Sequence, residues 1–188
     1  QGWDIKGILK TIVMSDTYRR SSSVTPGLYS ADPNNNLLGR APRLRLPGNV
    51  LRDHALFVSG LLVEESGGPS VKPYQPANLW REASNFSYSP GQGKDLYRRS
   101  LYTYWKRTLA PPTMSLLDSA DREWCSVKPR RTNTPLQALT LLNDVTFTEA
   151  ARKLGERMLR SGGDTDAARI SFGFRTVATR TPEPQEVE

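Results

Sequence analysis

The sequence has one cysteine, Cys125, and one histidine, His54, among its 188 residues. One cysteine excludes a disulfide within the chain. So few Cys and His residues also exclude the usual structural zinc site and a Cys-x-x-Cys-His haem attachment. No apolar run approaches the roughly 20 residues of a membrane-spanning helix, and the mean hydropathy is −0.55. We therefore expect neither a cofactor in this chain nor a transmembrane segment.

The chain also lacks a secretory signal and an initiator Met, because Gln1 leads directly into an amphipathic pattern. At the other end, residues 181–186 have the sequence of a helix start, and the chain stops at Glu188 before that helix could form. We expect a processed or excised piece of a larger protein, with its last helix truncated near residue 188.

Basic residues exceed acidic ones by 26 to 19, which gives a net charge of +7. Nineteen of the 26 are arginines, which form bidentate ion pairs, stack on aromatic rings and bind phosphate. They are scattered in small groups: Arg19-Arg20, Arg40/Arg43/Arg45, Arg98-Arg99 and Lys128/Arg130/Arg131. This distribution is more typical of side chains that tie loops to helices than of a nucleic-acid surface. Nucleic acid is therefore disfavoured as a partner, and a basic nucleic-acid-binding domain is kept as an alternative.

The apolar spacing predicts a mainly α fold, a single domain of about six helices with two long ordered loops and little or no sheet. Helices are expected over 4–20, 47–62, 149–160 and 164–180, and a turn with a short helix over 115–123. Residues 94–108 fit a helix or a strand, and we favour a helix that Pro111-Pro112 would stop. Gly60 is expected to end the 47–62 helix.

Two stretches rich in Pro, Gly, Ser and Asn predict the long loops. We expect residues 24–47 to be held by the side chains of Arg40, Arg43 and Arg45. The second loop, residues 66–93, carries too many aromatic residues for a low-complexity segment, and we expect it to be ordered on the surface.

The most informative segment is Arg130 to Asp144, a helix entry followed by an almost wholly apolar helix. Thr134 is a suitable N-cap and Pro135 suits the first helical position. Its four leucines leave little room for a polar stripe, so we expect the helix to be buried on most sides. Four polar residues are then predicted to hold the preceding loop and the surrounding helices to this helix: Arg131, Asn133, Gln137 and Asn143.

Several stretches together resemble one family. They include Ser15-Asp16-Thr17-Tyr18-Arg19, Asp32-Pro33-Asn34, Arg45-Leu46, Arg52-Asp53, Gly67-Gly68-Pro69, Arg98-Arg99-Ser100-Leu101-Tyr102, Trp105-Lys106-Arg107, Arg131-Thr132-Asn133-Thr134-Pro135-Leu136-Gln137-Ala138-Leu139, Leu142-Asn143-Asp144 and Arg180-Thr181-Pro182. The chain is similar, nearly end to end, to a planctomycete-specific domain of unknown function at the C-terminal end of large bacterial proteins. Those proteins typically also carry an N-terminal cytochrome-c-like domain and a second planctomycete-specific domain.

The resemblance implies an exported protein, in the periplasm or at the cell surface, with a haem only in a separate domain of the parent protein. It implies no known reaction, so no catalytic residue is carried over. The chain departs from the family at Asn36, where an Arg is usual, and at Asn49, where an acidic residue is usual. If these two positions form an ion pair in relatives, this chain has lost both charged partners, and a role of that pair cannot be carried over.

Three groups of residues have the chemistry of a reactive site. Asp53, His54 and Ser59 have the residue types of a nucleophilic triad, but their spacing on one helix does not place the serine against the histidine. The carboxylates of Asp118, Asp121 and Glu123 could serve glycoside hydrolysis, although helix-capping acids are the more ordinary reading. Nearby cations could activate Cys125, which we instead expect to be a small buried apolar residue.

Aromatic and arginine side chains alternate around residues 97–107. Such a surface can stack on sugar rings or bases, or it can be a core face covered by arginine stems. Tyr74, Trp80, Tyr97 and Tyr104 are the candidate ligand-binding residues if they are exposed.

We therefore expect a non-catalytic module of a larger exported or cell-surface protein, which docks onto other domains of that protein or binds an extracellular polysaccharide. A carbohydrate-active hydrolase that uses Asp118, Asp121 or Glu123 is the enzymatic alternative.

Overall fold

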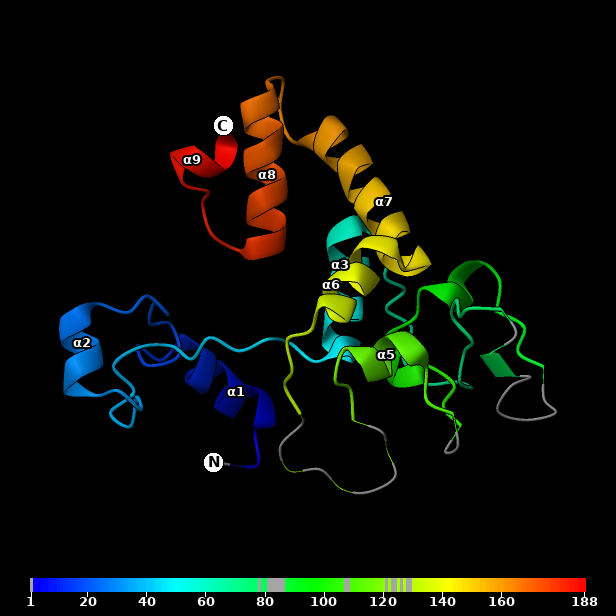
Figure 1. Ribbon diagram of the computed structural model, residues 1–188, viewed down its shortest axis with the longest axis horizontal. Helices are drawn as coiled ribbons and strands as arrows, with labels where there is room; N and C mark the ends of the chain where they lie inside the picture. Colours follow the sequence, from blue (N-terminus) through cyan, green and yellow to red (C-terminus); the bar gives the residue numbers. More distant parts are fainter. Residues whose placement is uncertain are drawn as a thin grey trace. The chain divides into compact units, whose positions relative to one another are not determined.

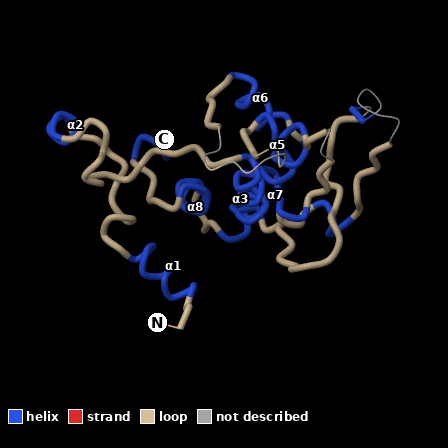
Figure 2. The backbone as a smooth tube through the Cα atoms, turned by 90° about the horizontal axis from the view of Figure 1, so that it is seen from below, coloured by secondary structure: helices blue, strands red, loops and turns tan. Residues whose placement is uncertain are grey.

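The computed structural model describes residues 2–77, 79–80, 87–106, 109–120, 122, 125, 127 and 130–188. This part of the chain is mainly α, as the sequence predicts. It has eight α-helices, two short 3-10 helices and, in place of a sheet, three isolated bridges (Figure 2). The chain divides into two compact units, Gln1–Arg45 and Leu46–Glu188, and each is described by itself.

The first unit contains α1 (Ile5–Met14) and α2 (Pro26–Ala31). The prediction that the first helix continues to residue 20 is wrong. The Ser15 hydroxyl donates to the carbonyl of Ile12 and accepts from the Tyr18 amide, and these bonds turn the chain out of the helix. The second helix falls within the stretch predicted as a loop, because the Thr25 hydroxyl accepts from the Leu28 amide and a proline follows at the first helical position.

Asp32 holds the loop after α2. Its carboxylate accepts from the amides of Asn36 at 2.9 Å and Leu37 at 2.7 Å, and the Leu37 amide is the main cause that lowers the pKa of Asp32. Arg40 donates to the carbonyl oxygens of Asp32 and Pro33, as expected for a loop-holding arginine. Asp32 is the only buried residue among the described residues of this unit.

The second unit is built around α3 (Gly48–Ser59), which packs against α7 (Val145–Ser161) and α5 (Pro112–Leu116). The chain continues from α6 (Pro135–Asn143) into α7, and then through α8 (Asp166–Ala178) to α9 (Pro184–Val187) (Figure 1). Leu56 and Leu117 are fully buried in the core between α3 and α5. Gly48 is needed there, because a Cβ at this position would lie 2.7 Å from Cβ of Leu117. As predicted, Gly60 ends α3, in the left-handed conformation with φ 79°.

The predicted helix over 94–108 is wrong. Two 3-10 helices, η1 (Gly93–Leu96) and η2 (Ser100–Tyr102), occupy the described part of this stretch. Their neighbours form backbone bonds with distant residues instead of with a helix. The Val63 amide donates to the Tyr97 carbonyl, and the Val71 amide donates to the Tyr102 carbonyl. These bonds use carbonyls that a continuous helix would have needed.

Several predicted helix boundaries also move. Pro111-Pro112 was expected to stop a helix, but Pro112 begins α5, because proline suits the first helical position. The short helix therefore begins three residues before the predicted 115–123 and ends at Leu116. Asp144 caps α7, so this helix begins at Val145 and not at residue 149. The last helix, expected to be cut off, forms as α9 with a Glu183–Glu186 capping box.

Glu186 is expected to remain ionised in the folded protein down to about pH 2. The guanidinium of Arg180 donates to both carboxylate oxygens of Glu186, at 2.7 and 2.8 Å. With the Glu183 amide, it lowers the pKa of Glu186 to about 2 from an ordinary 4.5. Because the folded-state pKa is depressed, the pair stabilises the α8–α9 end above about pH 4.5, and this contribution is lost as the pH falls towards 2.

An NMR titration of the Glu186 carboxyl carbon measures this pKa. Arg180→Gln should raise the midpoint towards 4.5, because it removes the main cause of the shift. An unchanged midpoint in the variant would show that the pair does not form.

Candidate functional site

Arg52 is a buried cation on α3, with only 5% of its surface exposed. One terminal nitrogen donates to the Leu96 carbonyl at 2.7 Å. The other donates to the Arg98 carbonyl at 2.9 Å and to the Ser100 hydroxyl at 3.3 Å. Burial lowers the pKa of Arg52, and the nearby carboxylates of Asp53 and Asp144 oppose this shift. The charge is thus used to hold the irregular chain around residues 96–100 against α3.

Asp53 and Arg98 continue this arrangement. Asp53 accepts from the Ser100 amide at 2.7 Å and lies 3.6 Å from the exposed guanidinium of Arg99. Arg98 is buried and donates to the carbonyl oxygens of Glu65, Gly67 and Pro69. Its guanidinium lies 4.0 Å from the centre of the Tyr102 ring. These predicted family residues therefore tie loops to each other and to α3.

The aromatic residues proposed as a ligand surface are largely internal. Trp80 is only 5% exposed and stacks on Tyr88 at 5.2 Å, with Tyr104 tilted against it at 5.9 Å. The ammonium group of Lys72 lies over the rings of Tyr88 and Tyr104. Trp80 therefore does not meet the condition of exposure on which it was a candidate ligand-binding residue. Its packing on neighbouring rings takes the contact that a ligand would need.

The other two candidate tyrosines, Tyr74 and Tyr97, are half-buried. The Tyr97 hydroxyl donates to Glu149 on α7 at 2.8 Å. Burial, with this hydrogen bond to the carboxylate as the second cause, raises the pKa of Tyr97 to about 12. Tyr97 therefore joins the 93–103 segment to α7.

Gln137 on α6 is the centre of a polar cluster. Its side-chain oxygen accepts from the Thr134 amide at 3.0 Å, which completes a capping box with the Thr134 hydroxyl. Its amide group donates to the Leu116 carbonyl and to the Thr132 hydroxyl, both at 2.8 Å, and to Asp118 at 3.3 Å. Gln137 is 4% exposed and is the only buried residue of α6. It fixes the helix to the end of α5 and to the loop before α6.

The predicted burial of α6 is therefore reversed. Leu136, Leu139 and Leu142 are 52%, 56% and 76% exposed. Their spacing of three residues places them along one side of the helix, and we call these three residues the leucine face. The helix is oriented by the hydrogen bonds of Gln137 and not by its leucines. An exposed apolar row of this kind is typical of an interaction surface.

The other polar residues of the segment do not hold neighbouring elements as predicted. Arg131 and Asn133 are exposed, and the Asn143 side chain donates to the Leu139 carbonyl within its own helix. Thr132 and Asp144 join neighbouring elements instead. Thr132 donates to Asp118, and Asp144 accepts from the Thr113 hydroxyl of α5 at 2.7 Å while it caps α7.

The described residues of the candidate reactive groups are engaged elsewhere or exposed. The Asp118 carboxylate accepts from the Thr132 amide at 2.7 Å and from Gln137, so it serves the loop before α6. Ser59 is buried and donates to the Leu56 carbonyl, which turns its hydroxyl back into its own helix. Cys125 is a free, exposed thiol, so the expectation of a buried residue is wrong.

Three residues singled out in the sequence lie outside the described residues: Arg107, Asp121 and Glu123. Of the remaining family-motif residues, Arg45 and Trp105 are half-buried. The Arg122 guanidinium lies 4.6 Å from the centre of the Trp105 ring, so this tryptophan is also covered by a cation.

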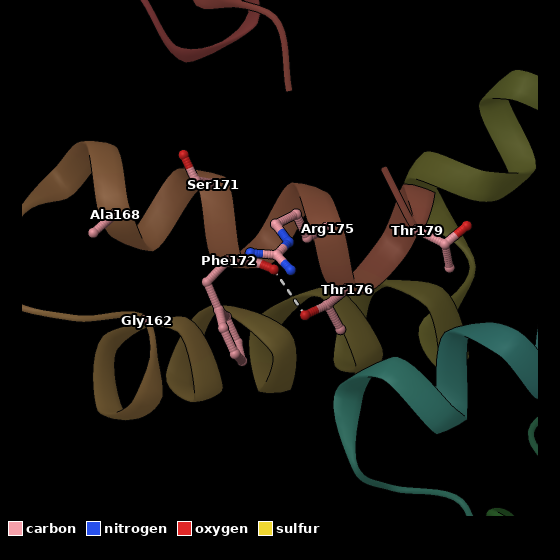
Figure 3. Close-up of a pocket in the computed structure, with 7 residues that line it drawn as sticks. All are labelled: Gly162, Ala168, Ser171, Phe172, Arg175, Thr176 and Thr179. Carbon is pink, nitrogen blue, oxygen red and sulfur yellow. Dashed lines mark hydrogen bonds between the residues drawn. The ribbon is translucent and has the colours of Figure 1, made fainter. Parts of the chain in front are cut away.

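An open groove of about 710 Å³ runs along α8. Figure 3 shows its lining, and the lining residues are Gly162, Ala168, Ser171, Phe172, Arg175, Thr176 and Thr179. The Thr176 hydroxyl donates to the Phe172 carbonyl at 2.7 Å, so it is used within the helix (Figure 3). This lining contains no carboxylate, histidine or cysteine, and it offers no acid–base pair or nucleophile.

A second groove of about 510 Å³ lies beside α3 and includes Asp53 and His54. Asp53 is held there by Arg99 and the Ser100 amide, as described above. The groove places His54 among the apolar side chains of Val50, Phe57 and Leu62, and its polar lining also includes Glu64, Ser66 and Arg99.

A protein-family model matches residues 1–188 of the chain, and its description is PSD1, protein of unknown function (DUF1553). This chain belongs to that family. No curated protein and no solved structure matches it. The DUF1553 family assignment carries no reaction, in agreement with the resemblance found in the sequence.

Within the part of this DUF1553 chain that the structure describes, no group of three or more His, Cys, Asp or Glu residues is placed to hold a metal ion. The same described residues include no helix that is long and apolar enough to cross a membrane.

Sequence reasoning missed the bonds between Asp118 and Thr132 and between Thr113 and Asp144. A local signal existed for Asp144, because an aspartate directly before a helix is a favoured N-cap. No local signal existed for Asp118, whose partner Thr132 lies fourteen residues away in the sequence.

Proposed function

We propose that this chain is a non-catalytic module of a larger exported bacterial protein and that it docks onto another domain of that protein through the leucine face of α6. The observation that carries the proposal is the orientation of this helix. Its one buried side chain is Gln137, whereas Leu136, Leu139 and Leu142 are turned to solvent.

The chemistry of α6 favours a protein partner. The nine residues of the helix include no acidic or basic side chain, so the surface offers apolar contact and no charge for a phosphate backbone. A row of leucines on a rigid helix suits an apolar surface on another domain. The polar cluster beneath the helix fixes its orientation, which lowers the entropic cost of binding.

The family resemblance supports partners within one larger protein. The neighbours it implies are a cytochrome-c-like domain and a second planctomycete-specific domain, in the periplasm or at the cell surface. We propose these neighbours as the docking partners.

The other functions considered from the sequence have less support. A polysaccharide site loses its central ring, because Trp80 is buried. A hydrolase would need Asp118 free to act, and this carboxylate is engaged by Thr132 and Gln137. The basic excess offers no nucleic-acid surface on α6, and no described groove combines an aromatic row with several free cations.

Leu142→Asp is expected to weaken binding to the separately expressed remainder of the parent protein by about 100-fold, or about 2.8 kcal/mol. The new carboxylate would have to be buried against an apolar surface. Because Leu142 is 76% exposed, its replacement should not change the melting temperature. Isothermal titration calorimetry measures the binding.

The matched control is Leu159→Asp, which places the same charge at another exposed leucine, on α7. It should bind like the parent sequence. Docking through the leucine face would be contradicted if Leu142→Asp binds as tightly as the parent sequence. It would also be contradicted if both variants lose the same affinity.

A further inference from the structure

The first unit lacks a buried apolar side chain among its described residues, although α1 is strongly amphipathic. Five aliphatic residues of α1 recur at three- and four-residue spacings and share one face, and all are between 42% and 67% exposed. They are Ile5, Ile8, Leu9, Ile12 and Val13. A ten-residue helix is marginal in water without packing. The helix is therefore suited to a partner that covers this face.

The charges beside this face are mostly positive. Lys6 and Lys10 are exposed and lie four residues apart, on the side of α1 away from Ile8. Arg19 and Arg20 follow the helix and are also exposed. Residues 2–20 contain only two acids, and one of them, Asp4, is used to cap α1 through the Gly7 amide. Unit Gln1–Arg45 as a whole has seven basic and three acidic residues.

Aromatic residues flank α1 at both ends. Trp3, directly before the helix cap, is 93% exposed, and Tyr18 beyond the other end is also exposed. Trp and Tyr favour the boundary between water and lipid, because each combines an apolar ring with a polar group. Long lysine side chains can keep their charge in water while their stems lie along an apolar surface.

We propose that α1 lies flat in the interface of a membrane that contains anionic lipid. The apolar face would enter the acyl region, and the basic residues would face the headgroups. This occupant is favoured over a protein surface by the combination of an apolar face, a basic border and aromatic ends, which the uncharged leucine face of α6 does not have. The inference is independent of docking through α6.

The test is binding of the whole chain to vesicles of phosphatidylcholine alone and of phosphatidylcholine mixed with phosphatidylglycerol. We expect stronger binding to the mixed vesicles, weakened by salt, and a blue shift of Trp3 fluorescence that is missing in Trp3→Phe. The double variant Lys6→Gln/Lys10→Gln should bind roughly 25-fold more weakly, because each basic residue near an anionic surface contributes about fivefold.

Ile8→Asp/Ile12→Asp should abolish binding without changing the melting temperature, since neither residue is buried. Leu37→Asp is the control, because this leucine of the same unit is 82% exposed but lies outside α1. Equal binding of the chain to both kinds of vesicle, or no binding to either, overturns the proposal. The proposal is also overturned if a second copy of the chain covers α1. Sedimentation would then show an oligomer that is monomeric in Ile8→Asp/Ile12→Asp.

Discussion

Arg52→Met is expected to lower the free energy of unfolding by about 3 kcal/mol. The substitution keeps the volume of the aliphatic stem but removes charge-assisted hydrogen bonds to the carbonyls of Leu96 and Arg98, each worth about 1.5 kcal/mol or more. It also leaves these two carbonyls without their partner in a buried region. Urea denaturation monitored by circular dichroism measures the change as a shift of the midpoint.

Arg99→Met is the matched control, because it makes the same substitution at a guanidinium that is largely exposed and whose closest approach to Asp53 is 3.6 Å. Its expected effect is below about 1 kcal/mol. If the two variants lose similar stability, the carbonyl contacts of Arg52 do not stabilise the fold. If neither loses any, the 93–103 segment is held by its backbone bonds alone.

The role of the arginines could be predicted from the sequence only in outline. Their scattered distribution indicated side chains that tie loops to helices. Arg52 does so, whereas Arg98 joins two loops and Arg40 holds the loop after α2. The sequence could not show which arginines would be buried. The acceptors of Arg52 are carbonyls more than forty residues away, and every residue type offers a carbonyl.

Helices with strong local signals were predicted well. The helix that became α3 has a regular apolar spacing and a glycine at its end. Thr134 caps α6 as expected, and α8 lies within the expected range 164–180. The segment after Gly93 was not predicted, because its conformation depends on backbone bonds to Val63 and Val71. A pattern of neighbouring residues contains no information about such distant partners.

The sequence predicted the segment that contains the candidate site, but it did not predict which side of α6 is exposed. The segment around Thr134 was correctly singled out, and its cap was correctly placed. Which side of α6 faces the core was predicted wrongly, because hydrophobicity suggested that the leucines would be buried. The helix instead buries a residue whose amide satisfies a carbonyl, a hydroxyl and a carboxylate at once. The four leucines do not all face one side of the nine-residue helix, and this spread is why the sequence predicted burial on most sides.

Gln137→Leu is expected to cost about 2 to 3 kcal/mol of unfolding free energy, although it makes α6 more apolar. It leaves the Leu116 carbonyl and the Thr134 amide without their partner, and each buried polar group left unpaired costs about 1 to 3 kcal/mol. Leu142→Gln makes the opposite exchange on the same helix. It should change stability by less than about 0.5 kcal/mol, because this side chain already lies in water.

The two variants distinguish a helix anchored by Gln137 from a helix anchored by buried leucines. A helix with buried leucines would lose more stability in Leu142→Gln than in Gln137→Leu. In urea denaturation of both, a larger loss for Leu142→Gln than for Gln137→Leu would mean that the leucines are buried in the chain itself. The leucine face would then not be a docking surface. The expected order instead means that the stability of α6 comes from its polar side, so its apolar side is free to bind a neighbouring domain.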